Sequence, residues 1–206
     1  LVMSTYQHDN VSLKFASAND NDRLQKQQID QFIKEGVNLL IVSPNQIHTI
    51  SSVVDKAYDA GIPVILFDRK TDSEKYTAFI GADNYEAGHE MGLFIAQQLG
   101  GKGNVIEIGG LKGSSPAIER DRGFTEALKA YPDIKIVGRY YTDWQEERGA
   151  AVMDSILAQG QKVDYVFGQN DRIAAGARKL AMKRGEKAIR FVGIDALPVA
   201  GGGMED

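Results

Sequence analysis

Seven polar or aromatic residues in the sequence stand where a predicted β-strand gives way to a loop or a helix. Carboxylates accept hydrogen bonds, a guanidinium donates them in a fork, and amides do both. This mixture suits vicinal hydroxyl groups, each of which needs a donor and an acceptor, and an indole can pack on the apolar face of a sugar ring. Any one of these residues alone fits a cap or a salt bridge, but seven at equivalent places predict a ligand site. The seven are Asp68, Arg69, Asn84, Arg120, Trp144, Asn170 and Asp195.

Other chemistries find less support in the sequence. The run from Gly109 to Ser114 could cradle a phosphate at a helix N-terminus, but its spacing is neither G-x-G-x-x-G nor a P-loop, so a tight turn into a Ser-capped helix is preferred. His8, His48 and His89 are scattered without ligand spacing, which argues against a metal site. The serines that end the glycine-rich run lack the G-x-S-x-G spacing of a hydrolase. We therefore expect no catalytic residue, no metal and no cofactor.

Composition places the chain among ordinary globular proteins. Of its 206 residues, 43% are apolar and 25% are charged, and the net charge of −4 argues against a nucleic-acid partner. The apolar runs have the length of strands and are too short to cross a membrane. The chain has no cysteine, which excludes disulfides and thiolate chemistry and is compatible with an oxidising compartment.

The elements that must position the seven residues alternate between strands and helices. Strict β-α-β alternation predicts parallel sheets with right-handed crossovers, and strands that are apolar on both faces predict helix layers on both sides. Ligands bind outside the carboxyl ends of such strands, so the polar residues that follow them are expected to meet there. Trp144 is expected to open a helix. The predicted strands are residues 11–16, 37–42, 62–67, 76–80, 104–108, 135–141, 163–167 and 189–194.

A repeated strand–helix–strand pattern within the sequence predicts two lobes with the same architecture. A strand, a helix and a strand that ends at Asp68 parallel a second such set that ends at Asp195, at nearly the same spacing. Two facing sets of strand tips would form a cleft. No linker rich in Pro, Ser or Gly divides the chain, so we expect strand crossovers to join an N-terminal lobe of residues 1–82 to a C-terminal lobe of residues 83–206. Both lobes are expected to be incomplete, because both ends of the chain look cut.

Six short motifs follow one another along the chain. They are Ile-Val-Ser-Pro-Asn (41–45), Val-Ile-Leu-Phe-Asp-Arg (64–69), Gly-Ala-Asp-Asn (81–84), Gly-Ser-Ser-Pro-Ala-Ile-Glu-Arg (113–120), Asn-Asp-Arg-Ile-Ala (170–174) and Gly-Ile-Asp-Ala-Leu-Pro (193–198). Together they resemble the type I periplasmic sugar-binding proteins, a group that includes the ribose-binding proteins and the core of lactose-repressor-type regulators. In particular, the chain resembles the periplasmic sensor domains of hybrid two-component systems from Bacteroides-type bacteria, which carry a similar Asp-Trp at 143–144.

The resemblance implies two Rossmann-like α/β lobes with parallel sheets, joined by strand crossovers and truncated at both ends. The family's first strand, its aromatic-bearing first helix and its C-terminal return to the first lobe are not in the sequence, so the ligand set is expected to be incomplete. By the same resemblance, Asp68 and Arg69 would hold ring hydroxyls from the N-terminal lobe, and Trp144 would take the aromatic position. The residues expected to hold hydroxyls from the crossover and the second lobe are Asn84, Arg120, Asn170 and Asp195.

The expected function is that of a periplasmic monosaccharide-binding sensor domain, the extracytoplasmic part of an inner-membrane protein. Such a domain closes on its sugar by a hinge and signals to a histidine kinase and response regulator module in the same full-length chain. The domain itself is not expected to be an enzyme, and a homodimer is left open. The alternatives are a soluble sugar-binding component of an ABC transporter and the effector core of a lactose-repressor-type regulator. A nucleotide-dependent enzyme built on Gly109 to Ser114 is the weakest alternative.

Overall fold

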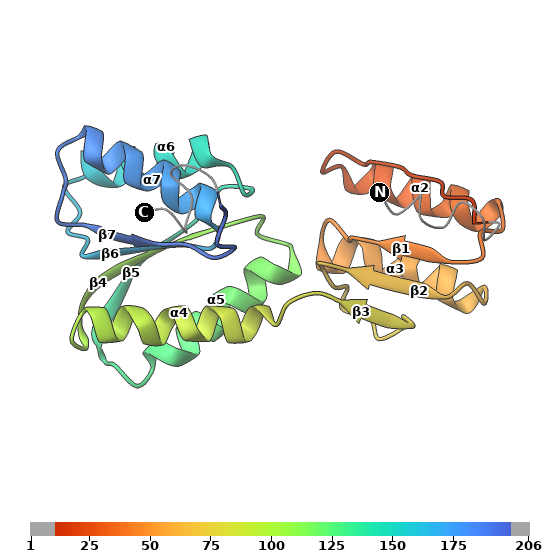
Figure 1. The fold of residues 1–206 in the computed structure, drawn as a ribbon, viewed down its shortest axis with the longest axis horizontal. Helices are drawn as coiled ribbons and strands as arrows, with labels where there is room; N and C mark the ends of the chain where they lie inside the picture. The colour runs from red at the N-terminus through yellow and green to blue at the C-terminus, as the bar shows by residue number, and fades with distance from the viewer. Residues whose placement is uncertain (1–10, 199–206) are drawn as a thin grey trace.

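A computed structural model of the protein describes residues 11–198, which form strands and helices in alternation (Figure 1). In chain order the elements are α2 (Asp22–Lys34), β1 (Leu40–Val42), α3 (Ile47–Asp59), β2 (Val64–Phe67), β3 (Ala78–Ile80), α4 (Asn84–Gln98), β4 (Lys102–Gly109), α5 (Ser115–Leu128), β5 (Asp133–Tyr141), α6 (Glu146–Ala158), β6 (Tyr165–Gly168), α7 (Asp171–Lys183) and β7 (Arg190–Val192). They build a three-stranded sheet of order β1-β2-β3 and a four-stranded sheet of order β5-β4-β6-β7. All strand pairs are parallel, which confirms the predicted α/β class.

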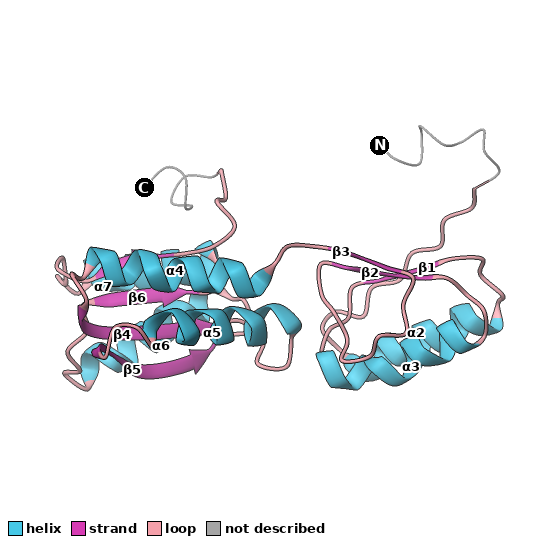
Figure 2. Cartoon of the chain, turned by 90° about the horizontal axis from the view of Figure 1, so that it is seen from below, coloured by secondary structure: helices cyan, strands magenta, loops and turns pink. Residues whose placement is uncertain are grey.

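The three-stranded sheet carries both of its helices on one face (Figure 2). Ile50 of α3 and Leu66 of β2 are fully buried in the core between the helices and the sheet. On the opposite face, Ile41, Phe67 and Ile80 are exposed. Within residues 11–198, the expectation that these strands are covered on both sides is therefore wrong, because α2 and α3 pack on the same face of the sheet.

The four-stranded sheet is covered on both faces, by α4 and α5 on one side and by α6 and α7 on the other (Figure 1). Successive side chains of a strand point to opposite faces, so neighbouring residues enter different layers. Val105 and Phe167 pack with Phe124 of α5, whereas Ile106 and Val166 pack toward α6 and α7. None of the helices in residues 11–198 has the length and apolar character needed to cross a bilayer.

Helices α4 and α5 approach so closely that only glycine fits at the contact. A Cβ atom on Gly88 would lie 2.1 Å from the carbonyl oxygen of Arg120, and one on Gly123 would lie 2.0 Å from that of Tyr85. Glycine permits this close approach because it has no side chain. The contact sets the start of α4, where Asn84 lies, against the turn of α5 that carries Arg120, and so brings two predicted site residues together.

Residues 11–16, predicted as a strand, pair with no strand in the part of the chain that the structure describes. The segment lies along α2 instead. Lys14 Nζ is 2.6 Å from Glu35 Oε2, and Gln28 Nε2 donates to the Ser17 carbonyl oxygen at 2.8 Å. The strand prediction is therefore wrong here, because alternation alone does not make a strand without a partner that supplies ladder hydrogen bonds.

Candidate functional site

The loops that follow the strands of the two sheets meet one another. The Ile47 N–H, at the start of α3, donates to the Gly113 carbonyl oxygen at 2.8 Å, and the Lys70 N–H donates to Ser115 Oγ at 2.7 Å. Lys70 Nζ also lies 3.1 Å from Glu119 Oε1. The carboxyl ends of the two parallel sheets therefore face each other, and polar side chains stand on both sides of the junction.

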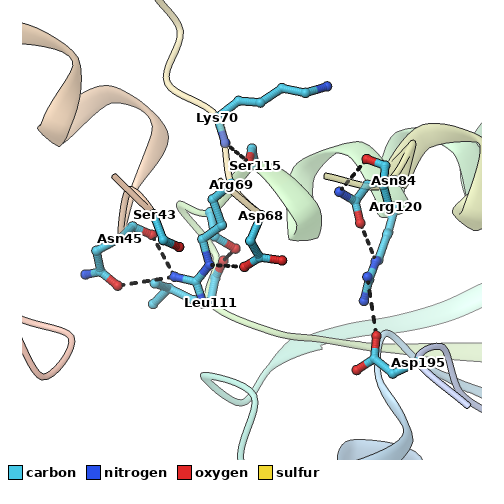
Figure 3. Close-up of polar contacts among 12 residues, drawn as sticks. Ser43, Asn45, Asp68, Arg69, Lys70, Asn84, Leu111, Ser115, Arg120 and Asp195 are labelled. Atoms are coloured by element: carbon cyan, nitrogen blue, oxygen red, sulfur yellow. Dashed lines mark hydrogen bonds and ion pairs between the residues drawn. The ribbon is translucent and has the colours of Figure 1, made fainter. Parts of the chain in front are cut away.

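Asp68 and Arg69 directly follow β2 and supply the polar groups of the three-stranded half. Arg69 Nη1 donates to the Asn45 carbonyl oxygen at 3.1 Å, and Arg69 Nε lies 3.8 Å from Asp68 Oδ2 (Figure 3). The Asp68 side chain is 62% exposed, against 18% for Arg69. Asn45 thus orients the guanidinium while the carboxylate of Asp68 stays open to a ligand. Asn45 was not among the predicted site residues, although it ends the motif at 41–45.

Arg120 gathers the polar groups of the four-stranded half. Its Nε donates to Asn84 Oδ1 at 2.9 Å, and its Nη2 lies 3.6 Å from Asp195 Oδ1 (Figure 3). Its Nη1 donates to the Gln169 carbonyl oxygen at 2.5 Å. Burial lowers the pKa of Arg120, and the negative charges of Asp195 and Asp68 oppose this lowering. Burial raises the pKa of Asp195, and the charge of Arg120 acts in the opposite direction. The guanidinium and the two carboxylates therefore belong to one electrostatic cluster that spans both halves.

The indole of Trp144 lies near both arginines. The guanidinium carbon of Arg69 is 6.0 Å from an indole ring centroid, and that of Arg120 is 5.8 Å from it, within the range of cation–π attraction. The indole also rests on Gly110, since a Cβ atom there would lie 2.2 Å from three indole atoms. The expectation that Trp144 opens a helix is wrong, because a left-handed turn lays the indole on Gly110 and α6 begins only at Glu146.

Backbone strain marks three of the seven predicted residues. The φ angles are 65° at Asp68, 66° at Trp144 and 109° at Asp195. Residues other than glycine rarely adopt such angles, and strain of this kind concentrates at ligand sites. In addition, the indole Nε1 of Trp144 is buried without a hydrogen-bond partner among the described residues. The strained backbone at these three loops favours a ligand at this place.

Asn170 lies at the same strand end as this cluster, but its position is already explained by the fold. Its Oδ1 accepts a hydrogen bond from the Ile173 N–H at 2.9 Å, which caps the N-terminus of α7. The residue before it, Gln169, contacts Arg120 through its carbonyl oxygen. A ligand at the cluster would therefore meet Asn170 through its amide nitrogen.

Gln169 and Glu107, two buried residues outside the predicted seven, support this arrangement. Gln169 Nε2 donates to Glu107 Oε1 at 2.8 Å and to the Ala117 carbonyl oxygen at 3.0 Å, and Gln169 Oε1 accepts from the Gly110 N–H at 3.1 Å. Glu107 Oε2 lies 3.2 Å from Arg139 Nε. The sequence carried a signal for Glu107, which is a charged residue inside an otherwise apolar strand segment.

One group of described residues has atoms placed as in a metal-ligand set. Glu86, His89 and Glu90 on α4 offer ligand atoms within 4.8 Å of one another. His89 also stacks on Tyr85, with ring centroids 6.1 Å apart. Both carboxylates are exposed on the helix surface, and exposed acidic groups commonly gather without an ion. We assign no metal to this group.

Facing parallel sheets with polar groups at their carboxyl ends define a two-part α/β binding domain. A family model described as a periplasmic binding protein domain matches residues 4–206. The chain belongs to this family.

Sequence relatives support the assignment. The chain is 30% identical over 197 residues to the xylitol-binding protein of Mycolicibacterium smegmatis and 31% identical over 198 residues to the galactofuranose-binding protein of Escherichia coli. These matches cover 95% and 91% of this chain but 56% and 62% of the two relatives, so the chain spans less than two thirds of their length.

Solved structures agree with this family. The fructose binding periplasmic domain of a hybrid two component system matches with a TM-score of 0.93 and 46% identity, covering 99% of this chain and 68% of that one. A galactofuranose binding protein matches with a TM-score of 0.87 and 31% identity, covering 95% and 69%. The resemblance to periplasmic sugar-binding proteins, including a two-component sensor domain, is confirmed.

Glu107 should make the stability of the protein depend on pH. Burial raises its pKa from 4.5 to about 8, Asp121 acts in the same direction, and Gln169 and Arg139 oppose the rise. The folded state thus holds a proton that the unfolded state releases, so this contribution to stability is complete below pH 4.5 and is lost as the pH rises to about 8. We predict that the free energy of unfolding falls over this pH range and that Glu107→Gln makes the fall shallower.

Denaturant unfolding at a series of pH values measures this slope. Glu147→Gln, at an exposed position in the first turn of α6, is the matched control and should follow the wild type. Equal slopes for the wild type and Glu107→Gln would contradict the role of Glu107.

Proposed function

We propose that the chain is the ligand-binding part of a periplasmic sensor, which closes on a monosaccharide and signals to a histidine kinase and response regulator module of the same full-length protein. The observation that carries the proposal is the convergence of Arg69 from one half and Arg120 from the other on Trp144. Residues 1–82 and 83–206 are then the two lobes, with a hinge where the chain passes from β3 to α4. The domain would lie in the periplasm as part of an inner-membrane protein.

The groups at the facing strand ends suit a polyol. The carboxylates of Asp68 and Asp195 accept hydrogen bonds from hydroxyl groups, and the guanidinium of Arg69 donates them. The indole ring of Trp144 offers apolar surface to the C–H groups of a sugar. These roles explain why acceptors, donors and an aromatic ring gather at one place.

Closure follows from the division of these groups between the halves. A ligand shifts an open–closed equilibrium only through its different affinity for the two forms. Only a closed form presents Asp68 and Asp195 to one sugar at the same time. The hydrogen bonds of Ile47 to Gly113 and of Lys70 to Ser115 already cross between the halves, so the sugar has to supply only part of the free energy of closure.

The similar proteins indicate which sugars to test first. One similar structure is named as fructose binding and another as galactofuranose binding. We therefore propose a hexose or pentose in its ring form, with D-fructose as the first candidate.

Titration calorimetry against D-fructose, D-ribose, L-arabinose and D-galactose tests the binding function. At least one sugar should bind, and Asp68→Ala should weaken that binding by about 2–5 kcal/mol, because hydroxyl groups and Arg69 lose a charged partner once the closed site and its sugar have excluded water. The matched control is Asp59→Ala on α3, whose carboxylate is exposed and bonded to Lys75. Absence of binding to all four sugars, or equal affinities for the two alanine variants, would contradict the proposal.

Transport is the second candidate, because the chain is also 29% identical over 187 residues to the ribose import binding protein of Escherichia coli.

In the sensor role, closure must change the phosphorylation of an attached kinase module. We predict that the bound sugar alters phosphorylation of the full-length protein in membranes and that Asp68→Ala removes the response. If the full-length protein has no kinase module and the sugar instead enters through a permease, the transport role replaces the sensor role.

A further inference from the structure

Gln169 joins strand β4 to helix α5 behind the proposed sugar site. It is 1% exposed and directly follows β6. Its N–H donates to the Ile108 carbonyl oxygen at 2.9 Å, and its own carbonyl oxygen accepts from Arg120 Nη1 at 2.5 Å. Its side chain reaches Glu107 of β4, Gly110 directly after β4, and the Ala117 carbonyl of α5.

These contacts leave the side-chain amide one orientation. Both hydrogens of Nε2 point at oxygen acceptors, on Glu107 and Ala117, while Oε1 faces the Gly110 N–H. A flipped amide would set its oxygen against two oxygens and its NH₂ group against an N–H. Buried amides with all their partners in place are rigid, and an unpaired buried group is costly.

The side chain and the carbonyl oxygen of Gln169 each contact a residue that positions or belongs to the proposed sugar site. The Gly110 N–H that it holds belongs to the residue on which the indole of Trp144 rests, where no Cβ atom would fit. The backbone also connects the turn at Trp144 to Gly110, because the Asp143 N–H donates to the Gly110 carbonyl oxygen at 3.3 Å. At the other end, the Gln169 carbonyl fixes Arg120, which lies 5.8 Å from the indole centroid.

We propose that Gln169 is a positioning residue of the sugar site. Its side chain holds the backbone of Gly110 in place beneath the indole of Trp144, and its carbonyl oxygen orients the guanidinium of Arg120. The sugar part of this inference rests on the proposed function, but the placement of Trp144 does not. A residue that only stabilises the fold would change the melting temperature and leave the indole where it is. A positioning residue moves the indole in protein that is still folded.

Fluorescence separates these two roles, because Trp144 is the only tryptophan in the chain. In the ligand-free 206-residue protein, Gln169→Met should shift the Trp144 emission to longer wavelength and increase its quenching by acrylamide, since the Gly110 N–H loses its partner. The matched control is Gln161→Met, which removes a similar amide bond to the Val137 carbonyl oxygen, 2.9 Å long, and should leave the emission unchanged.

Gln169→Glu supplies a second test that does not depend on how well Gln169→Met folds. Its carboxyl group keeps an acceptor for Gly110 but can donate to Glu107 only when the pair holds a proton. Glu107 is also faced by Asp121 of α5 and by Arg139 and Tyr141 of β5. Because burial raises the pKa of Glu107 to about 8, the pair holds a shared proton below that pH. The emission of Gln169→Glu should therefore resemble that of the wild type below about pH 8, whereas the emission of Gln169→Met should stay shifted.

Calorimetry with the same four sugars completes the test. Gln169→Met should bind roughly tenfold more weakly than Gln161→Met, the effect of one buried polar group that loses its partner. If no sugar binds to the wild type, the proposed function fails while the fluorescence test of Gln169 still stands. Folded Gln169→Met with unchanged emission and quenching, or Gln169→Glu with an emission as shifted as that of Gln169→Met below about pH 8, would overturn the positioning role.

Discussion

A buried positive charge is the constraint on which this molecule depends most. Arg120 lies inside the junction of α5 with the four-stranded sheet, and a guanidinium is costly to bury unless its donors are met. Asn84 at the start of α4, the Gln169 carbonyl at the end of β6 and Asp195 after β7 meet them. Each partner belongs to a different element, so the contacts that satisfy the charge also hold three chain segments together. The geometry of the site and the packing of this half cannot be changed independently.

The surrounding structure lets the charge of Arg120 face that of Arg69 across the junction of the two halves. Gly88 lets α4 pack against the backbone of α5 at Arg120, and Gly110 gives Trp144 a flat surface. From the other half, Arg69 is aimed at the same indole by the Asn45 carbonyl. Two like charges on one ring repel each other, and the nearby carboxylates balance them. A polyol between the halves would add acceptors and donors to this set, which is why binding and closure are linked in our account.

Much of the fold follows from local sequence, whereas the supports of the site do not. Apolar periodicity and polar strand ends predicted the strands from residues 37–42 onward and placed Asp68 and Asp195 in loops. The pattern failed at residues 11–16 because strand formation requires a partner that alternation does not reveal. It also failed at Trp144, where a left-handed turn prevailed over helix periodicity. Gln169 could not be found in this way, because its partner Glu107 is 62 positions away in the chain. The assignment of the seven site residues stays a prediction.

The central claim is that a sugar draws the two halves together at their facing strand ends. Two backbone amides report this directly, because the N–H groups of Ile47 and Lys70 donate across the junction to Gly113 and Ser115. The decisive measurement is residue-resolved hydrogen exchange of the protein with and without D-fructose, with the Leu66 amide in the core of the first sheet as reference. Our account predicts that exchange at Ile47 and Lys70 slows when the sugar is bound, while exchange at Leu66 is unchanged. Exchange at Ile47 and Lys70 that is the same with and without bound sugar would contradict it.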